Sequence, residues 1–398
     1  MSRDRATQSR RRFLKAAGVS AVAMSAAGCS GSDGGSGDGG SGGDGGSGGD
    51  GGSSGDGGST GGGGMQDITV GMAPGGFQGM VADHILEDTD ILQTEMEERG
   101  YSAEILRSWE ETALFASGGP DFSFMSVLEA TRLSSERGMD LAAFGRIAPM
   151  FMGWWVEKGG PYDPVDIGGA QATMDKIVND GANVGIGSWA GGHVPVDQIG
   201  IGEAYDYTFS EDENEFETVT ADYIAIPQLV LQGDLDVGST APIFGVALHL
   251  DDNGEPRHRE VFNGAGLLDE LGIGVPPFNN FITTQGFMDE NEGAAEALLH
   301  AWHQGMSWLN DDPMGRVMED EQDHFEQIGV ENEAQAQYVI DWGVDMNMDN
   351  DYPYNYVDVE YTDDRVEGER NFLDQAQQRG FVPEGWGDRL THVQVPQE

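Results

Sequence analysis

Short apolar runs alternate along the chain with turns of small residues and with longer segments whose apolar positions recur every three to four residues. The first pattern predicts strands and the second predicts helices. The predicted strands span 67–72, 103–108, 121–125, 150–156, 183–187, 218–224, 236–238 and 280–284. The predicted helices span 81–97, 112–117, 168–180 and 226–231, with others beginning after 126, after 193, at 239–242 and near 291. Strands that alternate with helices predict mostly parallel sheets with helices on both faces.

One arrangement of elements occurs twice. Residues 114–126 and 229–240 each contain a short helix, a glycine, an aspartate, a strand and a hydroxyl residue at a predicted helix start. We therefore expect two similar α/β lobes. At the first of these helix starts, Ser126 and Glu129 match a capping box. After 291 one helix face is apolar and is predicted to lie in the core, through Ala295, Leu298, Leu299, Trp302, Met306 and Leu309.

The N-terminal segment has the pattern of an export signal. Residues 9–15, S-R-R-R-F-L-K, resemble a twin-arginine (Tat) signal. The apolar stretch that follows, 16–28, is shorter than the roughly 20 residues that a membrane-spanning helix needs. Residues 26–29 then resemble a lipobox, which predicts cleavage after Gly28 and lipidation of Cys29.

The segment 30–64 contains only Gly, Ser, Asp and one Thr. Such a composition buries no apolar surface, so we expect a disordered tether. Its ends should lie roughly 30–35 Å apart on average. The sequence thus predicts a folded part that a lipid and a flexible tether hold just outside a membrane.

The charge of the chain narrows its possible partners. It has 70 acidic against 20 basic residues, and a formal net charge of −50. This charge repels nucleic acid and anionic membrane surfaces, so neither is an expected partner. Acidic excess with few lysines resembles the proteins of halophilic archaea, in which molar salt screens the repulsion. Cys29 is the only cysteine, which excludes a disulfide framework and thiol catalysis.

Catalytic and metal motifs are incomplete. The segment 187–191 lacks the glycines that a nucleophile elbow needs two residues before and after its serine. No H-E-x-x-H sequence occurs. The acidic run 345–349 begins like a calcium loop, but Asn350 and Tyr356 replace its glycine and glutamate. We therefore expect no catalytic residue, metal or cofactor. A secreted hydrolase and a structural surface protein remain the alternatives.

Five segments together resemble the solute-binding proteins of ABC importers of the nitrate, sulfonate and taurine class, with their pyrimidine-precursor-binding relatives. The segments are "ITVGMAPGG", "ALFASGGPDFSFMS", "VGIGSWAGGH", "LVLQGDLDVGSTAP" and "NNFITTQGFM", within 68–313. The resemblance implies a type II periplasmic-binding-protein fold: two α/β lobes, two crossover strands and a ligand cleft. It implies that 65–154 and 283–348 form lobe 1, 155–282 form lobe 2, and 349–398 form a packed C-terminal extension.

The resemblance also implies a function. We expect a monomeric lipoprotein on the outer face of the membrane that delivers a small solute to ABC permease and ATPase subunits. The expected ligand is a small anion such as a sulfonate, taurine, nitrate or bicarbonate. A neutral pyrimidine precursor of thiamine is the alternative.

Candidate ligand contacts lie where strands pass into helices, because ligands of open α/β sheets bind beyond the carboxyl ends of the strands. Helix starts offer unpaired backbone N–H groups to an anion, and a nearby hydroxyl adds an uncharged donor. Trp189 could stack against a planar ligand, whereas the hydroxyl residues could instead only cap their helices. The predicted contacts are Gly75, Gly76, Phe77, Ser126, Ser188, Trp189, His193, Ser239, Thr240 and Asn280.

Overall fold

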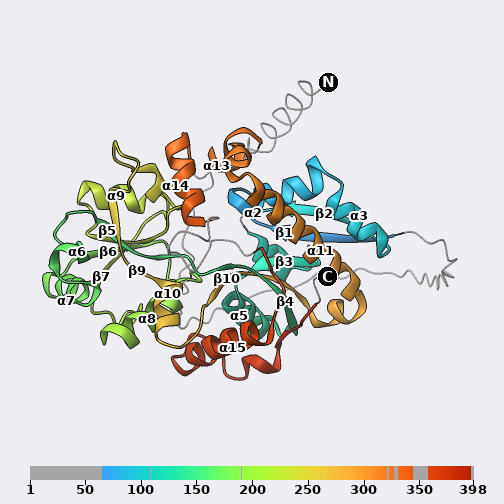
Figure 1. Cartoon of the computed structure of the whole chain (residues 1–398). Helices are drawn as coiled ribbons and strands as arrows, with labels where there is room; N and C mark the ends of the chain where they lie inside the picture. Colours follow the sequence, from blue (N-terminus) through green and yellow to red (C-terminus); the bar gives the residue numbers. More distant parts are fainter. Residues whose placement is uncertain are drawn as a thin grey trace, which may run out of the picture. The chain divides into compact units, whose positions relative to one another are not determined.

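Two mixed β-sheets organise the computed structural model, which describes residues 65–108, 110–189, 191–320, 322–326, 330–343 and 357–395 (Figure 1). The first sheet has the strand order β11-β4-β10-β3-β1-β2, and the second has the order β7-β6-β8-β5-β9. The strands of the first sheet are β1 (Gln66–Met72), β2 (Tyr101–Arg107), β3 (Phe122–Met125), β4 (Leu141–Pro149), β10 (Pro277–Thr284) and β11 (Leu390–His392). Those of the second are β5 (Gly153–Glu157), β6 (Asn183–Ile186), β7 (Glu217–Thr220), β8 (Val237–Thr240) and β9 (His258–Asn263).

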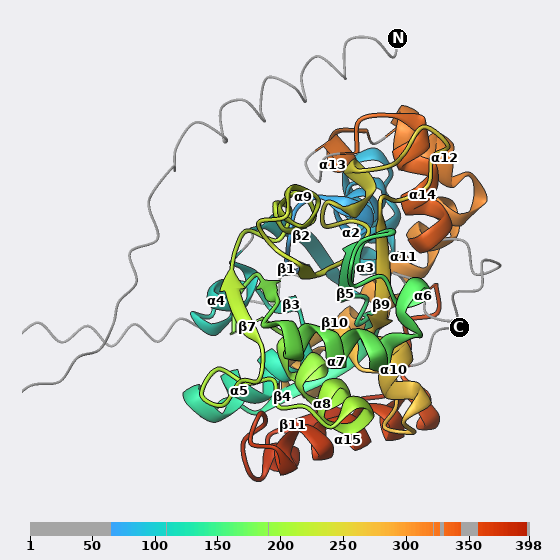
Figure 2. The same cartoon turned by 90° about the vertical axis from the view of Figure 1, so that its left-hand side faces the viewer.

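Helices follow most of the strands and cover the sheets (Figures 1 and 2). Around the first sheet lie α2 (Gly76–Asp83), α3 (Ile91–Glu98), α4 (Glu111–Ala116), α5 (Val127–Arg137), α11 (Gln285–Asp311), α12 (Pro313–Gly315), α13 (Gln322–Glu326), α14 (Glu333–Gly343) and α15 (Asp363–Gln378). The part of the chain that forms the second sheet, with its exit toward β10, contains α6 (Pro164–Ile167), α7 (Ala170–Asp180), α8 (Val194–Tyr205), α9 (Ile226–Gln232) and α10 (Gly264–Glu270).

The chain crosses between the sheets twice. It first passes from β4 to β5 through 150–152, and it returns from β9 through α10 to β10. The two connections lie side by side, because Met150 N–H donates to Pro276 O at 2.7 Å and Gly264 N–H donates to Met152 O at 2.9 Å. A Cβ atom on Gly264 would lie 2.9 Å from the same Met152 oxygen, so this crossing needs a glycine.

After each crossing the chain enters a sheet as a strand that is antiparallel to its neighbours, β5 in the second sheet and β10 in the first. β10 is antiparallel to β3 and β4, and β5 is antiparallel to β8 and β9. The sheets are therefore mixed, although β1, β2 and β3 pair in parallel, as do β6, β7 and β8. Trp154 belongs to a strand of the second sheet, although it was expected in lobe 1. Residues 277–282 belong to a strand of the first sheet, although they were expected in lobe 2.

Each sheet has its own apolar core. The larger core surrounds the first sheet, where Trp302 of α11 meets the rings of Phe124 and Phe281 edge to face. The apolar face predicted for this helix is confirmed, since all six of its residues are buried. The smaller core surrounds Trp154 of β5, which packs against Phe209 and Phe216. All described residues belong to one compact unit.

The C-terminal extension becomes part of the first sheet within its described residues. β11 pairs in parallel with β4 as an edge strand, and α15 carries the buried Glu369. Glu369 accepts a hydrogen bond from Tyr361 Oη at 2.9 Å and lies 2.8 Å from His392 Nε2. Its other oxygen lies 3.9 Å from Arg146 Nε of β4. This buried polar cluster fixes the extension to the sheet.

The secondary structure differs from the predictions in several places. The helix expected over 81–97 is broken by a π-helical turn, His84–Asp88. Ser239 and Thr240 do not begin a helix; they end β8, and a turn with Gly245 at φ 98° leads to the 3-10 turn Val246–Leu248. β4 was not predicted, because all nine of its residues are buried and give no alternation. The signal, lipobox, tether and acidic run 345–349 lie outside the described residues.

Candidate ligand cleft

A cavity of about 260 Å³ opens between the residues of the two sheets. On the side of the first sheet it is lined by the loop after β1, the first turns of α2, α4 and α5, and the beginning of β10. On the side of the second it is lined by the loop before α8, Tyr223 and the turn 243–244. The elements meet here because the carboxyl ends of β1 and β3 and the two crossings all reach this edge.

The α2 side of the cavity offers backbone and amide donors. Gly75 and Gly76 have φ of 89° and 62°, a conformation that only glycine adopts easily, and they place the helix start at the cavity. One turn on, Gln78 is buried, and its Oε1 accepts a hydrogen bond of 3.0 Å from Asn279 Nδ2 of β10. This bond orients the amide. Its Nε2 is buried without a hydrogen-bond partner among the described residues.

The α4 and α5 side is acidic. The predicted capping box is confirmed: Glu129 Oε2 accepts from Ser126 N at 2.9 Å and from Ser126 Oγ at 2.8 Å, while Ser126 Oγ accepts from Glu129 N. Glu111, in the first turn of α4, lines the same cavity, and its Oε2 is buried without a partner among the described residues. Burial, with a smaller contribution from the charge of Glu129, raises the pKa of Glu111 to about 7.

The second-sheet side consists of a buried histidine and a tyrosine. His193 Nδ1 lies 3.4 Å from Tyr223 Oη, and His193 Nε2 has no partner among the described residues. Burial lowers the pKa of His193 to about 4, so its ring is neutral at neutral pH. Burial raises the pKa of Tyr223 to about 12, so the phenol stays protonated. Gly187 is needed here because a Cβ atom would overlap the Tyr223 ring.

Aromatic rings close the remaining side. Tyr223 and Phe244 lie 5.9 Å apart with their planes 32° from parallel, and Phe278 contacts the ring of Phe151 at 4.5 Å. The cavity therefore combines an apolar, aromatic wall with a few oriented polar groups. This composition is typical of sites for small molecules.

Solved structures of similar architecture are binding proteins. The aliphatic sulphonate-binding protein SsuA of Escherichia coli superposes with a TM-score of 0.58 at 10% identity, over 84% of this chain and 94% of that protein. The alkanesulfonate-binding protein SsuA of Xanthomonas axonopodis pv. citri, bound to MOPS, gives a TM-score of 0.56 at 10% identity, over 83% and 99%. The nitrate-binding protein NrtA of Synechocystis PCC 6803 gives 0.52 at 13% identity, over 82% and 86%. The chain has the type II periplasmic-binding-protein fold. No family model and no curated protein matches the sequence.

In this periplasmic-binding fold, four of the ten predicted contacts come together. Gly75, Gly76, Ser126 and His193 all line the cavity. Sequence reasoning missed Gln78, Glu111 and Tyr223 as contacts and took Glu129 only as a helix cap. The signal for Gln78 was its place one residue after the expected Phe77, at the start of a helix that follows two glycines.

The other six predicted contacts lie elsewhere. Phe77 packs against Phe325 in the larger core, with ring centroids 4.8 Å apart. Trp189 packs against Phe209 in the smaller core, at 5.0 Å, and neither it nor Ser188 lines the cavity. These positions follow from apolar packing, which turns large rings toward a core.

Three of the polar residues among these six form hydrogen bonds within the fold. Ser239 Oγ donates to Asp197 at 3.0 Å, and Thr240 Oγ1 donates to the carbonyl of Phe244 at 2.9 Å. Asn280 Nδ2 donates to Tyr361 Oη at 2.6 Å. All three predicted residues are buried, so their hydroxyl and amide groups stabilise the fold.

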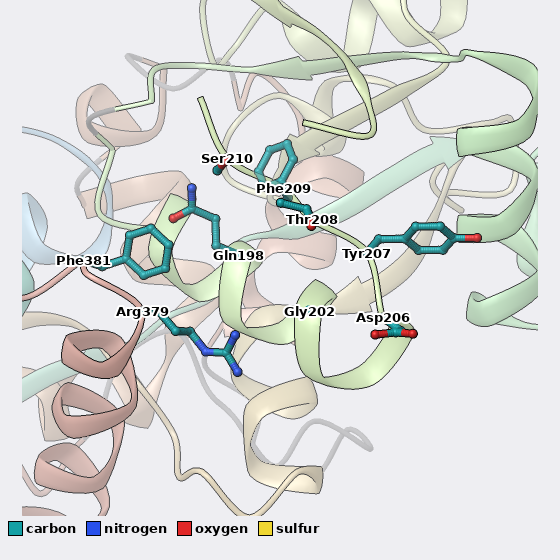
Figure 3. A pocket seen from close by; sticks show the side chains of 9 residues that line it. All are labelled: Gln198, Gly202, Asp206, Tyr207, Thr208, Phe209, Ser210, Arg379 and Phe381. Atoms are coloured by element: carbon teal, nitrogen blue, oxygen red, sulfur yellow. The ribbon is translucent and has the colours of Figure 1, made fainter. Parts of the chain in front are cut away.

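A second cavity, of about 390 Å³, lies between α8 and the chain that follows α15 (Figure 3). Gln198 and Gly202 line it from α8, and Arg379 and Phe381 from the other side. The Arg379 guanidinium already forms an ion pair with Glu203 of α8. The second cavity is therefore a weaker candidate for a ligand site than the cleft.

The described residues contain neither a metal-binding cluster nor a membrane-spanning helix. None of their His, Cys, Asp and Glu side chains form a group of three or more that could hold a metal ion. Among their helices, none combines the length and hydropathy that a membrane span requires.

Proposed function

We propose that the protein is an extracytoplasmic receptor that captures a small solute in the cleft and delivers it to an ABC importer. One observation carries this proposal. Three buried polar atoms, Gln78 Nε2, Glu111 Oε2 and His193 Nε2, have no hydrogen-bond partner within the described part of the chain, and all three belong to residues that line one cavity. Buried polar groups normally have hydrogen bonds, and unpaired ones cost free energy. A bound solute would supply the missing partners.

Two independent features support the transport role. The binding proteins that share the fold are named for sulfonate and nitrate ligands. The N-terminal sequence has, in order, the pattern of a Tat signal, a lipobox at Cys29 and a segment rich in Gly, Ser and Asp. A receptor held by a lipid outside the membrane, able to reach permease and ATPase partners, accounts for this order. The net charge of −50 argues against nucleic acid as a partner.

Two ligand classes follow from the family resemblance, and each can be matched to some of the groups that line the cavity. A small anion, such as a sulfonate, taurine, nitrate or bicarbonate, would use the N–H groups at the start of α2 and the amide of Gln78. A neutral pyrimidine would use the aromatic wall of Tyr223, Phe244 and Phe278. Trp189 does not serve this second class, because it packs against the smaller core and does not line the cavity.

Ser126 is the serine that a hydrolase would have to use in this cavity, and its hydroxyl donates to Glu129 at 2.8 Å as part of the helix cap. The reciprocal hydrogen bonds of Ser126 and Glu129 are those of a capping box, which accounts for both side chains without a catalytic role. We therefore infer a receptor and no bond-breaking step.

Thermal unfolding of the full chain in molar salt, with a panel of anions, pyrimidines and amines, tests the proposal. A ligand at about 100 times its Kd should add roughly 2.7 kcal/mol to the free energy of unfolding and raise Tm. Small-angle scattering should then show a more compact particle, as hinge closure requires. Chemical turnover of a compound that binds would overturn the proposal, and so would a panel without any effect on Tm.

A further inference from the structure

The charges that line the cleft have one sign. Its lining includes the carboxyl groups of Glu111 and Glu129 and, among the described residues, no lysine or arginine. His193 is neutral because burial lowers its pKa to about 4. An anion in this cavity would meet no positive side chain and would lie near two carboxyl groups, whose repulsion grows as water is excluded.

The two carboxyl groups are also placed to accept hydrogen bonds from a ligand. Glu129 is held by Ser126 N and Ser126 Oγ at 2.9 and 2.8 Å, so its carboxyl group is oriented before any ligand arrives. Glu111 Oε2 is buried and has no partner among the described residues. An oriented acceptor beside an unpaired one requires a ligand that donates hydrogen bonds.

The aromatic part of the lining suits a flat cation. Tyr223, Phe244 and Phe278 line the cavity, and the faces of aromatic rings attract positive charge. Gln78 Nε2 and the neutral His193 ring can pair with a polar atom at the other end of such a ligand.

We propose that the cleft recognises a small planar organic cation, whose amidinium or ammonium group donates hydrogen bonds to Glu111 and Glu129 while its apolar part lies against the aromatic wall. This inference rests on the proposed receptor function and names its ligand class.

Recognition of a cation has a characteristic pH dependence. The titratable groups that line the cavity with Glu111 are Glu129, His193 and Tyr223. The pKa values of His193 and Tyr223, about 4 and about 12, lie outside the range from pH 6 to 8. The pKa of Glu111, about 7, lies inside it. A cation that pairs with ionised Glu111 therefore binds more tightly at pH 8 than at pH 6, whereas an anion would show the opposite dependence.

Three probes of similar shape isolate charge: benzamidinium, benzamide and benzoate. Their Kd values are measured by calorimetry with the full chain in molar salt at pH 8. We expect benzamidinium to bind at least tenfold more tightly than benzamide, and benzoate to bind most weakly. Lowering the pH to 6 should raise the Kd of benzamidinium at least threefold and leave the Kd of benzamide unchanged.

A matched pair of variants tests the contact itself. Glu111→Gln should raise the Kd of benzamidinium at least tenfold without raising the Kd of benzamide. Glu110→Gln removes the same charge from the adjacent exposed residue, which does not line the cavity, and should change either Kd less than twofold. The unfolding midpoints of both variants show that they fold.

Several outcomes would overturn the inference: equal binding of benzamidinium and benzamide, tighter binding of benzoate, no binding by any of the three, or full retention of benzamidinium binding by Glu111→Gln. These outcomes are separable from failure of the receptor function. If a sulfonate or nitrate raises Tm in the wider panel, the receptor function stands and the cation class falls. If no compound of any charge raises Tm, both fall.

Discussion

Gly192 lies against Ser126, although the two residues belong to parts of the chain that form different sheets. A Cβ atom on Gly192 would lie 3.4 Å from Ser126 Oγ, and both residues line the cleft. A larger side chain at this position would enter the space that closes around a ligand. The contact therefore gives a direct test of whether the cleft is the binding site.

We expect Gly192→Leu to weaken ligand binding at least tenfold, because the leucine side chain fills part of a cavity of about 260 Å³. The measurement is the Kd of the best compound from the panel. Gly286→Leu is the control, since a Cβ atom there meets nothing within 4 Å and Gly286 lies outside the cleft. Unchanged binding in Gly192→Leu would place the site elsewhere.

The buried cluster around Glu369 predicts that the C-terminal extension contributes to stability. Glu369→Ala removes the acceptor of Tyr361 and the ionic partner of Arg146 and His392. Removing one member of a buried charged cluster typically costs about 3–5 kcal/mol, because the remaining charge is left without its partner. Chemical denaturation measures this loss.

The control for this variant is Glu367→Ala, an exposed position on the same helix. Surface substitutions of this kind usually change the free energy of unfolding by less than about 0.5 kcal/mol. If Glu369→Ala cost no more than Glu367→Ala, the cluster would not hold the extension in place.

Much of the fold could be predicted from the sequence, because β1, β2, β3 and the helices beside them show their periods and turn residues locally. The capping box at Ser126 was likewise a local signal. β4 and β9 were missed, and so were α10 and α15. For β4 the reason is that a strand buried on both faces gives no alternation.

The ligand contacts were harder to predict for a geometric reason. Neighbouring residues on a strand point to opposite faces, and on a helix they are about 100° apart. From the sequence, Asn279 and Asn280 could both reach a ligand, and Asn280 was taken as the predicted contact; Asn279 lines the cleft, whereas Asn280 donates a hydrogen bond to Tyr361. Phe77 was predicted, but the adjacent Gln78 lines the cleft. In both segments a neighbour of the predicted residue lines the cavity, because which of two neighbours does so depends on the face that tertiary packing buries.

Asp197 predicts a pH dependence of stability. It is fully buried, accepts hydrogen bonds from Trp154 Nε1 at 3.2 Å and Ser239 Oγ at 3.0 Å, and burial raises its pKa to about 7. A carboxyl group whose pKa is higher in the folded state stabilises the fold below its unfolded value of about 4 and loses that contribution as the pH rises to about 7. Asparagine can accept the same two bonds without ionising.

We therefore expect the stability advantage of Asp197→Asn over the original protein to grow by about 2–3 kcal/mol between pH 5 and pH 8. The measurement is urea denaturation at both pH values in the same salt. Asp252→Asn, which removes an exposed carboxyl group by the same substitution, is the control. An advantage that shrinks with rising pH would contradict the assignment of a buried ionising group.

The net charge of −50 predicts that salt stabilises the folded state. The Debye length falls from about 10 Å at 0.1 M to about 3 Å at 1 M, so molar salt removes most repulsion between surface carboxylates. We expect Tm to rise by at least 10 °C between 0.1 and 2 M KCl, which corresponds to roughly 7 kcal/mol for a folded part of about 330 residues.

Molar sucrose separates screening from other effects of concentrated solutes, because it stabilises proteins through exclusion from their surface and does not screen charge. The rise in KCl should exceed the rise in sucrose and should be steepest below 1 M, where the Debye length changes most. A Tm that rises equally in both solutes would mean that the acidic surface does not destabilise the fold at low salt. Such a result would also remove the main physical reason for expecting a protein adapted to high salt.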